Sequence, residues 1–228
     1  MNRIWILVKA AFLQLRMYVL SLLGYTAVSV LTDVVLNLTL GYGENSHISF
    51  GSTLVVLPVL IAIVLPLSFF KRIIHLGATR KEYYIGILMT YVIASMAVAV
   101  LYIVWMKVET IFSGMYGNHI IYLLEVFHWD QFGSAGMLVY QFGAYMLLIS
   151  IFNLLFSGLR HKAGWVICGV IIAAIPIGSS LPSIRSLVAD AFLKLLFNDS
   201  LLQGFGLTFF SSCLFLAGGW WFTKRRTL

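Results

Sequence analysis

Capping and charged side chains are concentrated in one polar gap of the sequence, KRIIHLGATRKEYY, at residues 71–84. Lys71 and Arg72 suit the C-terminal end of a preceding helix, where cations interact favourably with the helix dipole. Gly77 favours a helix end, because glycine readily adopts the left-handed conformation that closes helices. Thr79 and Glu82 have the spacing of a capping box, in which each side chain accepts a hydrogen bond from the other residue's backbone N–H. The gap therefore predicts a helix that ends near Gly77 and a second helix that starts at Thr79.

Two interpretations of this gap stay open on the residues alone. In the first, the gap is a compact helical knob whose Ile73, Ile74 and His75 are available to pack against a partner protein. In the second, it is an ordinary helical hairpin, and its cations only mark one side of a membrane. A capping box is common in proteins, so it does not decide between the two.

Long apolar stretches flank the gap and must position it. The chain has 228 residues, of which 61% are hydrophobic and only 10% charged, and its mean hydropathy is +0.98. Soluble domains are about half apolar and about a quarter charged, so lipid must solvate most of this chain. The apolar runs are continuous and near the length of about 20 residues with which a helix crosses a bilayer, and they lack the alternation of barrel strands. The sequence predicts an all-α polytopic membrane protein.

Six transmembrane helices are expected within a single transmembrane domain that covers residues 1–228. An amphipathic helix over residues 2–16 is expected to lie on the membrane surface, unless it is simply the start of the first crossing. A second amphipathic helix, between crossings five and six at residues 183–200, is expected to dip into the outer leaflet. The crossings are predicted at residues 17–39, 52–70, 83–106, 134–157, 164–181 and 204–223.

Lysine and arginine are distributed very unequally over the two sides that these crossings define. Only Lys107, Arg185 and Lys194 fall on one side. Basic residues accumulate on the cytoplasmic side of membrane proteins, so both termini are expected to be cytoplasmic. The cations are scattered over membrane-flanking gaps and form no single soluble face, which argues against a nucleic-acid partner. The expected cytoplasmic side holds the remaining 12 of the 15 lysine and arginine residues, namely Arg3, Lys9, Arg16, Lys71, Arg72, Arg80, Lys81, Arg160, Lys162, Lys224, Arg225 and Arg226.

Motifs for enzymatic chemistry are missing from the sequence. There is no GxxxxGK[ST] for nucleotide phosphates, no GxSxG and no HExxH, so the chain is not expected to be an enzyme. Its five histidines are scattered over the gaps, and no metal site is expected. Cys168 and Cys213 lie inside apolar stretches, where thiols behave as small hydrophobic groups. Asp33 is the one acid inside a crossing; it faces a substrate or proton pathway, or it is a tolerated carboxylate near the interface.

The string FFKRIIHLGATRKEYYIG, at residues 69–86, resembles the first cytoplasmic loop of small bacterial ABC exporter permeases. Such loops carry an aromatic-rich span end, a basic residue, a Gly-x-[Thr/Ser]-Arg-Lys motif, and then an aromatic residue and a glycine. The expected six crossings and two amphipathic helices agree with this family over the whole chain. A related pattern occurs in permeases with four crossings and a large outer domain, but this chain lacks such a domain. The matching residues are Gly77, Thr79, Arg80, Lys81, Tyr83, Tyr84 and Gly86.

The resemblance implies partners and a contact surface. In that family the loop is the coupling helix, which sits in a groove of a separate ATPase subunit. The resemblance implies no cofactor in this chain, because ATP and Mg²⁺ would bind to the ATPase partner. It also implies a second copy of the permease, or a related permease, in a bacterial plasma membrane. Arg160, His161 and Lys162, in the next gap on the same side, form a second expected contact. The implied coupling helix comprises Lys71, Arg72, Ile73, Ile74, His75, Gly77, Ala78, Thr79, Arg80, Lys81 and Glu82.

The function implied by the resemblance is export of an apolar or amphipathic cargo, such as an antimicrobial peptide, another antibiotic or a lipid. Asp33 is a candidate residue of the cargo pathway. One alternative is an immunity or sensing permease that responds to such peptides without true transport. Another is a membrane transporter or scaffold that uses no ATPase.

Overall fold

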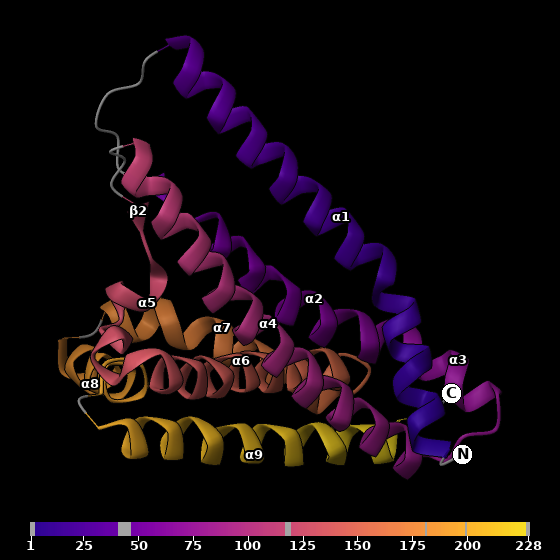
Figure 1. Cartoon of the computed structure of the whole chain (residues 1–228). Helices are drawn as coiled ribbons and strands as arrows, with labels where there is room; N and C mark the ends of the chain where they lie inside the picture. The colour runs from indigo at the N-terminus through magenta and orange to yellow at the C-terminus, as the bar shows by residue number, and fades with distance from the viewer. Residues whose placement is uncertain (1–2, 41–46, 117–119, 181, 199, 227–228) are drawn as a thin grey trace.

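The computed structural model describes residues 3–40, 47–116, 120–180, 182–198 and 200–226, and these fold almost entirely into helices (Figure 1). Two strands of two residues each, β1 and β2, pair in parallel. The all-helical fold predicted from the apolar runs is confirmed. In chain order the elements are α1 (Arg3–Leu40), β1 (His47–Ile48), the 3₁₀ helix η1 (Phe50–Val55), α2 (Val56–Val64), the π-helix η2 (Leu65–Phe69), α3 (Phe70–His75), α4 (Arg80–Tyr116), β2 (Ile120–Ile121), α5 (Leu123–Val126), the 3₁₀ helix η3 (Trp129–Phe132), α6 (Gly133–Gly158), α7 (Lys162–Ser180), α8 (Pro182–Leu196) and α9 (Leu201–Arg225).

Five helical stretches in the described part of the chain are long and apolar enough to cross a membrane. Four of them contain the predicted crossings two, three, four and six, and the first overlaps the predicted crossing one over residues 17–32. They are compatible with a multi-pass membrane protein. The predicted fifth crossing coincides with α7, a helix of 19 residues that is not among the five. A sixth crossing therefore stays a prediction. The five stretches are Arg3–Thr32, Gly51–His75, Arg80–Ile111, Trp129–Gly158 and Leu201–Arg225.

The N-terminal amphipathic segment is continuous with the first crossing. Residues 3–40 form the single helix α1, whose N-terminal part runs at an angle to the long remainder (Figure 1). Leu7, Ala11 and Leu15 are buried in the protein core, whereas Trp5 is 54% exposed. The apolar face of this segment thus packs largely on its own chain, and its contact with a membrane surface stays a prediction.

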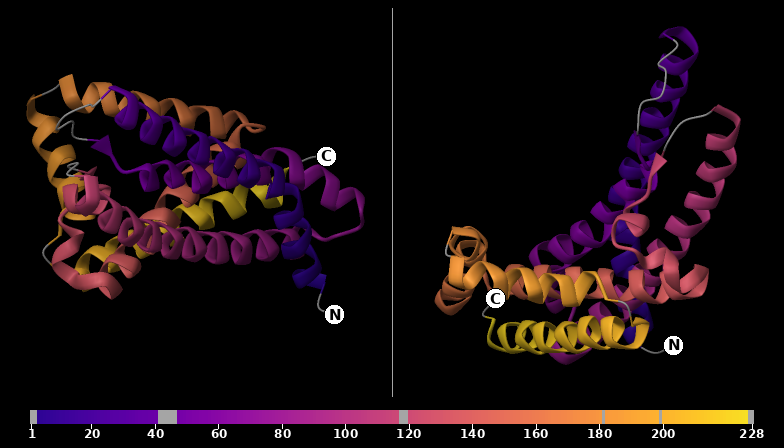
Figure 2. Two further views of the ribbon diagram at one scale, coloured as in Figure 1. Left: turned by 45° about the horizontal axis from the view of Figure 1, so that its top comes forward. Right: turned by 90° about the vertical axis from the view of Figure 1, so that its left-hand side faces the viewer.

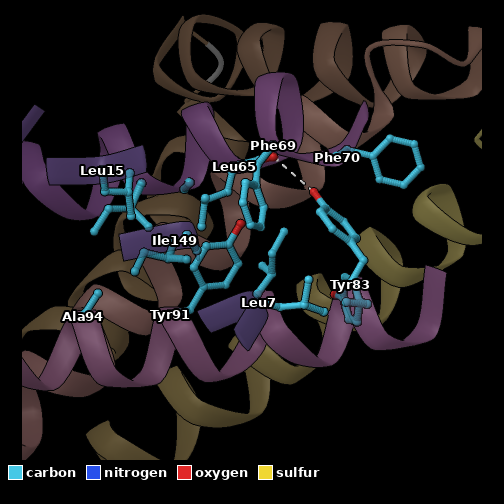
Figure 3. Close-up of a cluster of buried hydrophobic side chains, with 14 of the residues drawn as sticks. Leu7, Leu15, Leu65, Phe69, Phe70, Tyr83, Tyr91, Ala94 and Ile149 are labelled. Carbon is cyan, nitrogen blue, oxygen red and sulfur yellow. Dashed lines mark hydrogen bonds between the residues drawn. The ribbon is translucent and has the colours of Figure 1, made fainter. Parts of the chain in front are cut away.

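Two clusters of buried side chains hold the helices together. One cluster joins α1, α2, η2, α3, α4 and α6 and includes Leu65, Tyr83 and Tyr91 (Figure 3). The other lies toward the opposite ends of α4 and α6, where Trp129 stacks on Tyr140 with ring centroids 4.7 Å apart. The first cluster underlies the gap at residues 71–84 and fixes how that gap is presented.

Helices α6 and α9 lie side by side along their length (Figures 1 and 2). A Cβ atom on Gly219 would lie 2.3 Å from Nδ2 of Asn153, closer than real Cβ atoms approach, so a larger residue at this crossing would have to displace the Asn153 side chain. A Cβ atom on Gly218 would likewise lie 2.8 Å from Leu154. Small residues of this kind allow two helices to approach closely.

Helix α8, Pro182–Leu196, covers most of residues 183–200, where the second amphipathic helix is expected, and begins one residue before them. Trp129 donates a hydrogen bond from Nε1 to the carbonyl oxygen of Leu196 at 2.7 Å, and Tyr140 donates to that of Leu195 at 2.9 Å. These bonds join the end of α8 to η3 and α6. The placement of α8 in the outer leaflet of the membrane stays a prediction.

Candidate functional site

Helix α3 ends in a Schellman motif centred on Gly77. Gly77 has a φ of +87°, and its N–H donates to the carbonyl oxygen of Ile74 at 3.0 Å. The N–H of Ala78 donates to the carbonyl oxygen of Ile73 at 3.3 Å. This pair of bonds closes a helix when the residue after its end adopts a left-handed conformation, which glycine does without strain. The predicted helix end at Gly77 is confirmed.

Helix α4 begins with the predicted capping box. The N–H of Glu82 donates to Oγ1 of Thr79 at 3.2 Å, and the N–H of Thr79 donates to Oε2 of Glu82 at 2.8 Å. Arg3 of α1 lies beside the same carboxylate, with 3.8 Å between Nη1 and Oε1. Because the Arg3 side chain is 81% exposed, solvent screens this ion pair. The α3–α4 turn, residues 71–82, is thus closed by backbone-directed bonds on both sides.

One apolar side chain stands at the apex of the α3–α4 turn. Leu76 is 77% exposed, although it is not among the predicted contact residues. Ile73 is only 3% exposed and belongs to the core, so the expectation that it is available to a partner is wrong. Ile74 and Ala78 are half-buried against the same core. The residues of the turn that are exposed besides Leu76 are Lys71, Arg72, His75, Gly77, Thr79, Arg80 and Lys81.

Which apolar residue of α3 faces outward depends on how this short helix packs. Ile73 and Phe70, one turn apart, both face the core that α3 shares with α4. Leu76 is the C-cap of α3, at the point where the chain leaves the helix. The sequence carries no signal that separates Leu76 from Ile73 and Ile74, because all three are large and apolar.

Tyr83 joins the first turn of α4 to the π-helix η2. Its hydroxyl donates to the carbonyl oxygen of Leu65 at 3.1 Å (Figure 3). Its ring meets Phe70 edge to face, with centroids 4.9 Å apart. Tyr83 is buried, so this contact is shielded from water. Tyr83 therefore links the first turn of α4 directly to the end of the second predicted crossing.

Arg226, beyond the end of α9, reaches the same π-helix. Its Nη1 donates to the carbonyl oxygen of Pro66 at 2.6 Å, and its guanidinium lies 4.3 Å from the centre of the Phe70 ring. The side chain is 1% exposed, and Nε and Nη2 have no hydrogen-bond partner among the described residues. Burial, with repulsion from Arg160, lowers the pKa of Arg226 to about 10, so the group stays charged at neutral pH.

The π-helical turn with its proline differs from ordinary helix. Pro66 lies within η2, where the helix widens for five residues, and proline inside a helix is a usual cause of bends. Two successive carbonyl groups of η2, those of Leu65 and Pro66, accept the side-chain bonds from Tyr83 and Arg226. Single π-helical turns are frequent at functional sites.

Helix α9 is also joined to the start of α4. Arg80 donates from Nη1 to the carbonyl oxygen of Lys224, and the Tyr84 hydroxyl donates to that of Leu216. The Tyr84 ring lies 5.1 Å from the ring of Trp220. Two residues of the predicted motif therefore connect the α3–α4 turn to the last helix of the chain.

The second predicted contact lies at the same end of the protein. Arg160 and Lys162 are exposed in the tight α6–α7 turn, where the N–H of His161 donates to the carbonyl oxygen of Gly158 at 2.8 Å. His161 is half-buried, and its ring stacks on Phe222 of α9 with centroids 5.7 Å apart. Of these three residues, only the two cations project outward.

The α3–α4 turn, the α6–α7 turn and both ends of the described chain thus share one end of the helical bundle, which we call the basic end (Figure 1). Its cations come from segments that the charge count assigns to a single side. Asp33 lies on α1, but its side chain falls outside the described ones. No group of three histidine, cysteine or acidic residues that could hold a metal ion occurs among the described residues.

The chain matches no protein-family model, no curated protein and no solved structure. Its function is therefore inferred from the geometry of the basic end.

Proposed function

We propose that this chain is the transmembrane subunit of an ABC exporter in a bacterial plasma membrane, and that a separate ATPase subunit docks on its α3–α4 turn. The observation that carries the proposal is the build of that turn. A Schellman motif and a capping box close it on either side of Gly77, and Leu76 projects from its apex with 77% of its surface exposed. A surface with this rigid backbone loses little entropy when a partner binds.

The chemistry of the turn suits a partner groove with an apolar floor and an acidic rim. Leu76 supplies the apolar anchor, and Lys71, Arg72, Arg80 and Lys81 are exposed around it. An apolar centre with a charged rim is the usual anatomy of a protein interface. Rim charges contribute chiefly to the association rate and to the choice of partner.

The contacts behind the turn give a route by which movement of the ATPase reaches the crossings. Tyr83 bonds to η2 at the end of the second predicted crossing, while Arg80 and Tyr84 bond to α9. Closure of two ATPase subunits around ATP and Mg²⁺ would move these elements together. The α6–α7 turn, with Arg160 and Lys162, is a second point of contact with the ATPase.

A complete exporter would pair this chain with a second copy or with a related permease. Large apolar side chains are exposed along α1, α4 and α9, among them Leu31, Val104 and Phe210, and lipid or a second permease would cover them. The cargo in this proposal is apolar or amphipathic, with an antimicrobial peptide as the first candidate. Both termini lie in the cytoplasm.

The test begins with a cysteine in place of Leu76 on the full chain, carrying a photoactivatable crosslinker, in cells of the source organism. Crosslinks to an ABC ATPase support the proposal, and their absence from every such ATPase overturns it. Transport of labelled peptide into inside-out vesicles, driven by ATP, then separates export from sensing. Peptide that stimulates ATP hydrolysis without entering the vesicles would identify a sensing or immunity permease instead.

A further inference from the structure

A groove between α4 and α9 opens at the basic end, and its lining changes sharply in polarity along its length. Its volume is about 380 Å³, and Ile85 and Leu88 of α4 face Ala217 and Trp220 of α9 across it. Lys81 is the single charged residue in its lining, and no acidic residue lines it. The groove is therefore apolar over most of its length and cationic at one end.

Lys81 lines the cationic end of the groove, and a second lysine, Lys224, lies on α9 beyond the last lining residue, Trp220. Lys81 lies on the first turn of α4, and the preceding residue, Arg80, bonds to the carbonyl oxygen of Lys224. Lys224 is one helical turn beyond Trp220 on α9, so it shares the face of Trp220 that lines the groove. Both lysines are exposed. Glu82, the nearest acid in sequence, is engaged by Thr79 in the capping box.

The length of the groove suits a hydrocarbon chain. From Lys81 to Leu88 the α4 helix advances by about 10 Å, at the usual 1.5 Å per residue. Trp220 in the lining matches the preference of tryptophan for the boundary between headgroups and acyl chains. Anionic lipids have this arrangement, with a charged headgroup at one end and an apolar acyl chain that continues from it.

We propose that the α4–α9 groove is a binding site for an anionic phospholipid, with the lipid phosphate between Lys81 and Lys224 and one acyl chain along Ile85, Leu88 and Ala217. The two cations without a neighbouring free acid select an anionic headgroup over a zwitterionic one. The bound lipid would hold α4 and α9 together beside the α3–α4 turn. Lipid binding at this site requires no ATPase, so it can be tested on the purified chain alone. Its failure would not bear on the proposed function, and failure of the proposed function would not bear on it.

The test is native mass spectrometry of the full chain in detergent, titrated with dioleoylphosphatidylglycerol and, separately, with dioleoylphosphatidylcholine. The unaltered chain is expected to bind the anionic lipid at least about ten-fold more tightly. Two lysines near a membrane surface each contribute about five-fold to anionic lipid binding, so the double variant K81Q/K224Q should lose about 25-fold for that lipid alone. The variant A217F should weaken both lipids, because its ring would occupy the groove.

The matched control is K71Q/R72Q, which removes the same charge from the same end but away from the groove. An equal loss of anionic lipid in this control would show diffuse attraction to the basic end and would overturn the proposal. Displacement of the lipid by glycerol phosphate, which has no acyl chain, would also overturn it, as would unchanged binding in A217F. Each variant is first compared with the unaltered chain by size-exclusion chromatography, and A217L replaces A217F if the larger ring prevents folding.

Discussion

The guanidinium of Arg226 donates a hydrogen bond to the carbonyl oxygen of Pro66 at 2.6 Å, across 160 positions of sequence. The same π-helix accepts the hydroxyl of Tyr83 one residue earlier, at the carbonyl of Leu65. The chain segment after α9 and the start of α4 therefore meet on two adjacent peptide groups. This junction lies directly behind the α3–α4 turn, so it is the element through which force on the turn would enter the second predicted crossing.

Substitution of Arg226 by methionine should change stability little. The variant loses one charge-assisted hydrogen bond and a contact with the Phe70 ring, but it also removes a buried charge whose Nε and Nη2 have no partner among the described residues. Replacing a buried, incompletely paired charge by an apolar side chain of similar size is often neutral. We expect a change below about 1 kcal/mol, or below about 4 °C in the apparent melting temperature in detergent.

The comparison variant for Arg226 is Y83F, which removes only the hydroxyl that donates to Leu65. It should cost about 1 kcal/mol, the net value of a typical hydrogen bond. A loss of several kcal/mol in R226M would contradict the prediction, because it would mean that the remaining guanidinium N–H groups are bonded within the folded chain.

Introduction of a charge at Leu76 should abolish partner binding and leave the fold intact. Leu76 is 77% exposed, so L76E removes no core contact, yet it places an acid at the centre of the proposed docking surface. Interface anchors of this kind typically cost more than about 2 kcal/mol when lost, or about 30-fold in affinity. The measurement is the amount of ATPase that co-purifies with the tagged chain, alongside its melting temperature.

The matched control for L76E is L202E, because Leu202 is 84% exposed near the other end of α9. It should retain the ATPase. Equal co-purification with both variants would remove the α3–α4 turn from consideration as the docking surface.

Local sequence signals predict the backbone of the turn correctly, and they do so because the bonds involved span few residues. The left-handed glycine and the capping box each close within five positions of Gly77 or Thr79. The crossings are likewise predicted from continuous apolar runs. Properties that local spacing controls can thus be predicted from the amino-acid sequence alone.

Residues whose role depends on tertiary packing cannot be assigned in this way. Arg226 belongs by sequence to the cations that mark one side of the membrane, but it is buried against Phe70. Ile73, expected to be available to a partner, is buried, and Leu76, of which no role is expected, is exposed instead, because the packing of α3 decides which side chain is covered. The continuity of α1 is also open on the sequence, because the apolar face at residues 2–16 suits a membrane surface and a protein core equally well.

Replacement of Gly77 by alanine should destabilise the α3–α4 turn. A left-handed conformation costs a residue with a Cβ atom about 1–2 kcal/mol, and Gly77 has a φ of +87° with no atom near the added methyl group. The whole cost is therefore conformational. Limited proteolysis of the turn should become faster by about ten-fold, which corresponds to about 1.4 kcal/mol. G24A, inside α1 and also without a nearby atom, should show no increase.

Loss of the capping hydroxyl should weaken the same turn by a different mechanism. T79A removes the acceptor for the N–H of Glu82 and the donor to its carboxylate. Loss of an N-cap side chain typically costs about 1 kcal/mol. The first turn of α4 should then exchange its amide hydrogens faster. T26A serves as the control, because the Thr26 hydroxyl bonds to carbonyl oxygens one turn earlier in its own helix. Equal acceleration at the α4 start in both variants would refute a role for the cap.

The contact between α6 and α9 should be most sensitive at Gly219. In G219A the new methyl group would meet Nδ2 of Asn153 at 2.3 Å, and Asn153 is buried and accepts the hydroxyl of Tyr91 at 3.0 Å, so it has little freedom to move. Overpacking of this kind costs about 1–3 kcal/mol. G206A on the same helix meets no atom within 4 Å, so it should be neutral or slightly stabilising.

The combination of G219A with N153A tests the cause of that loss. Removal of the Asn153 amide makes room for the added methyl group, so the double variant should lose less stability than the sum of the two single variants. A coupling of about 1 kcal/mol or more, measured from melting temperatures in detergent, would show that the two residues compete for the same space. Strict additivity would mean that α6 and α9 do not approach closely at this point in the folded protein.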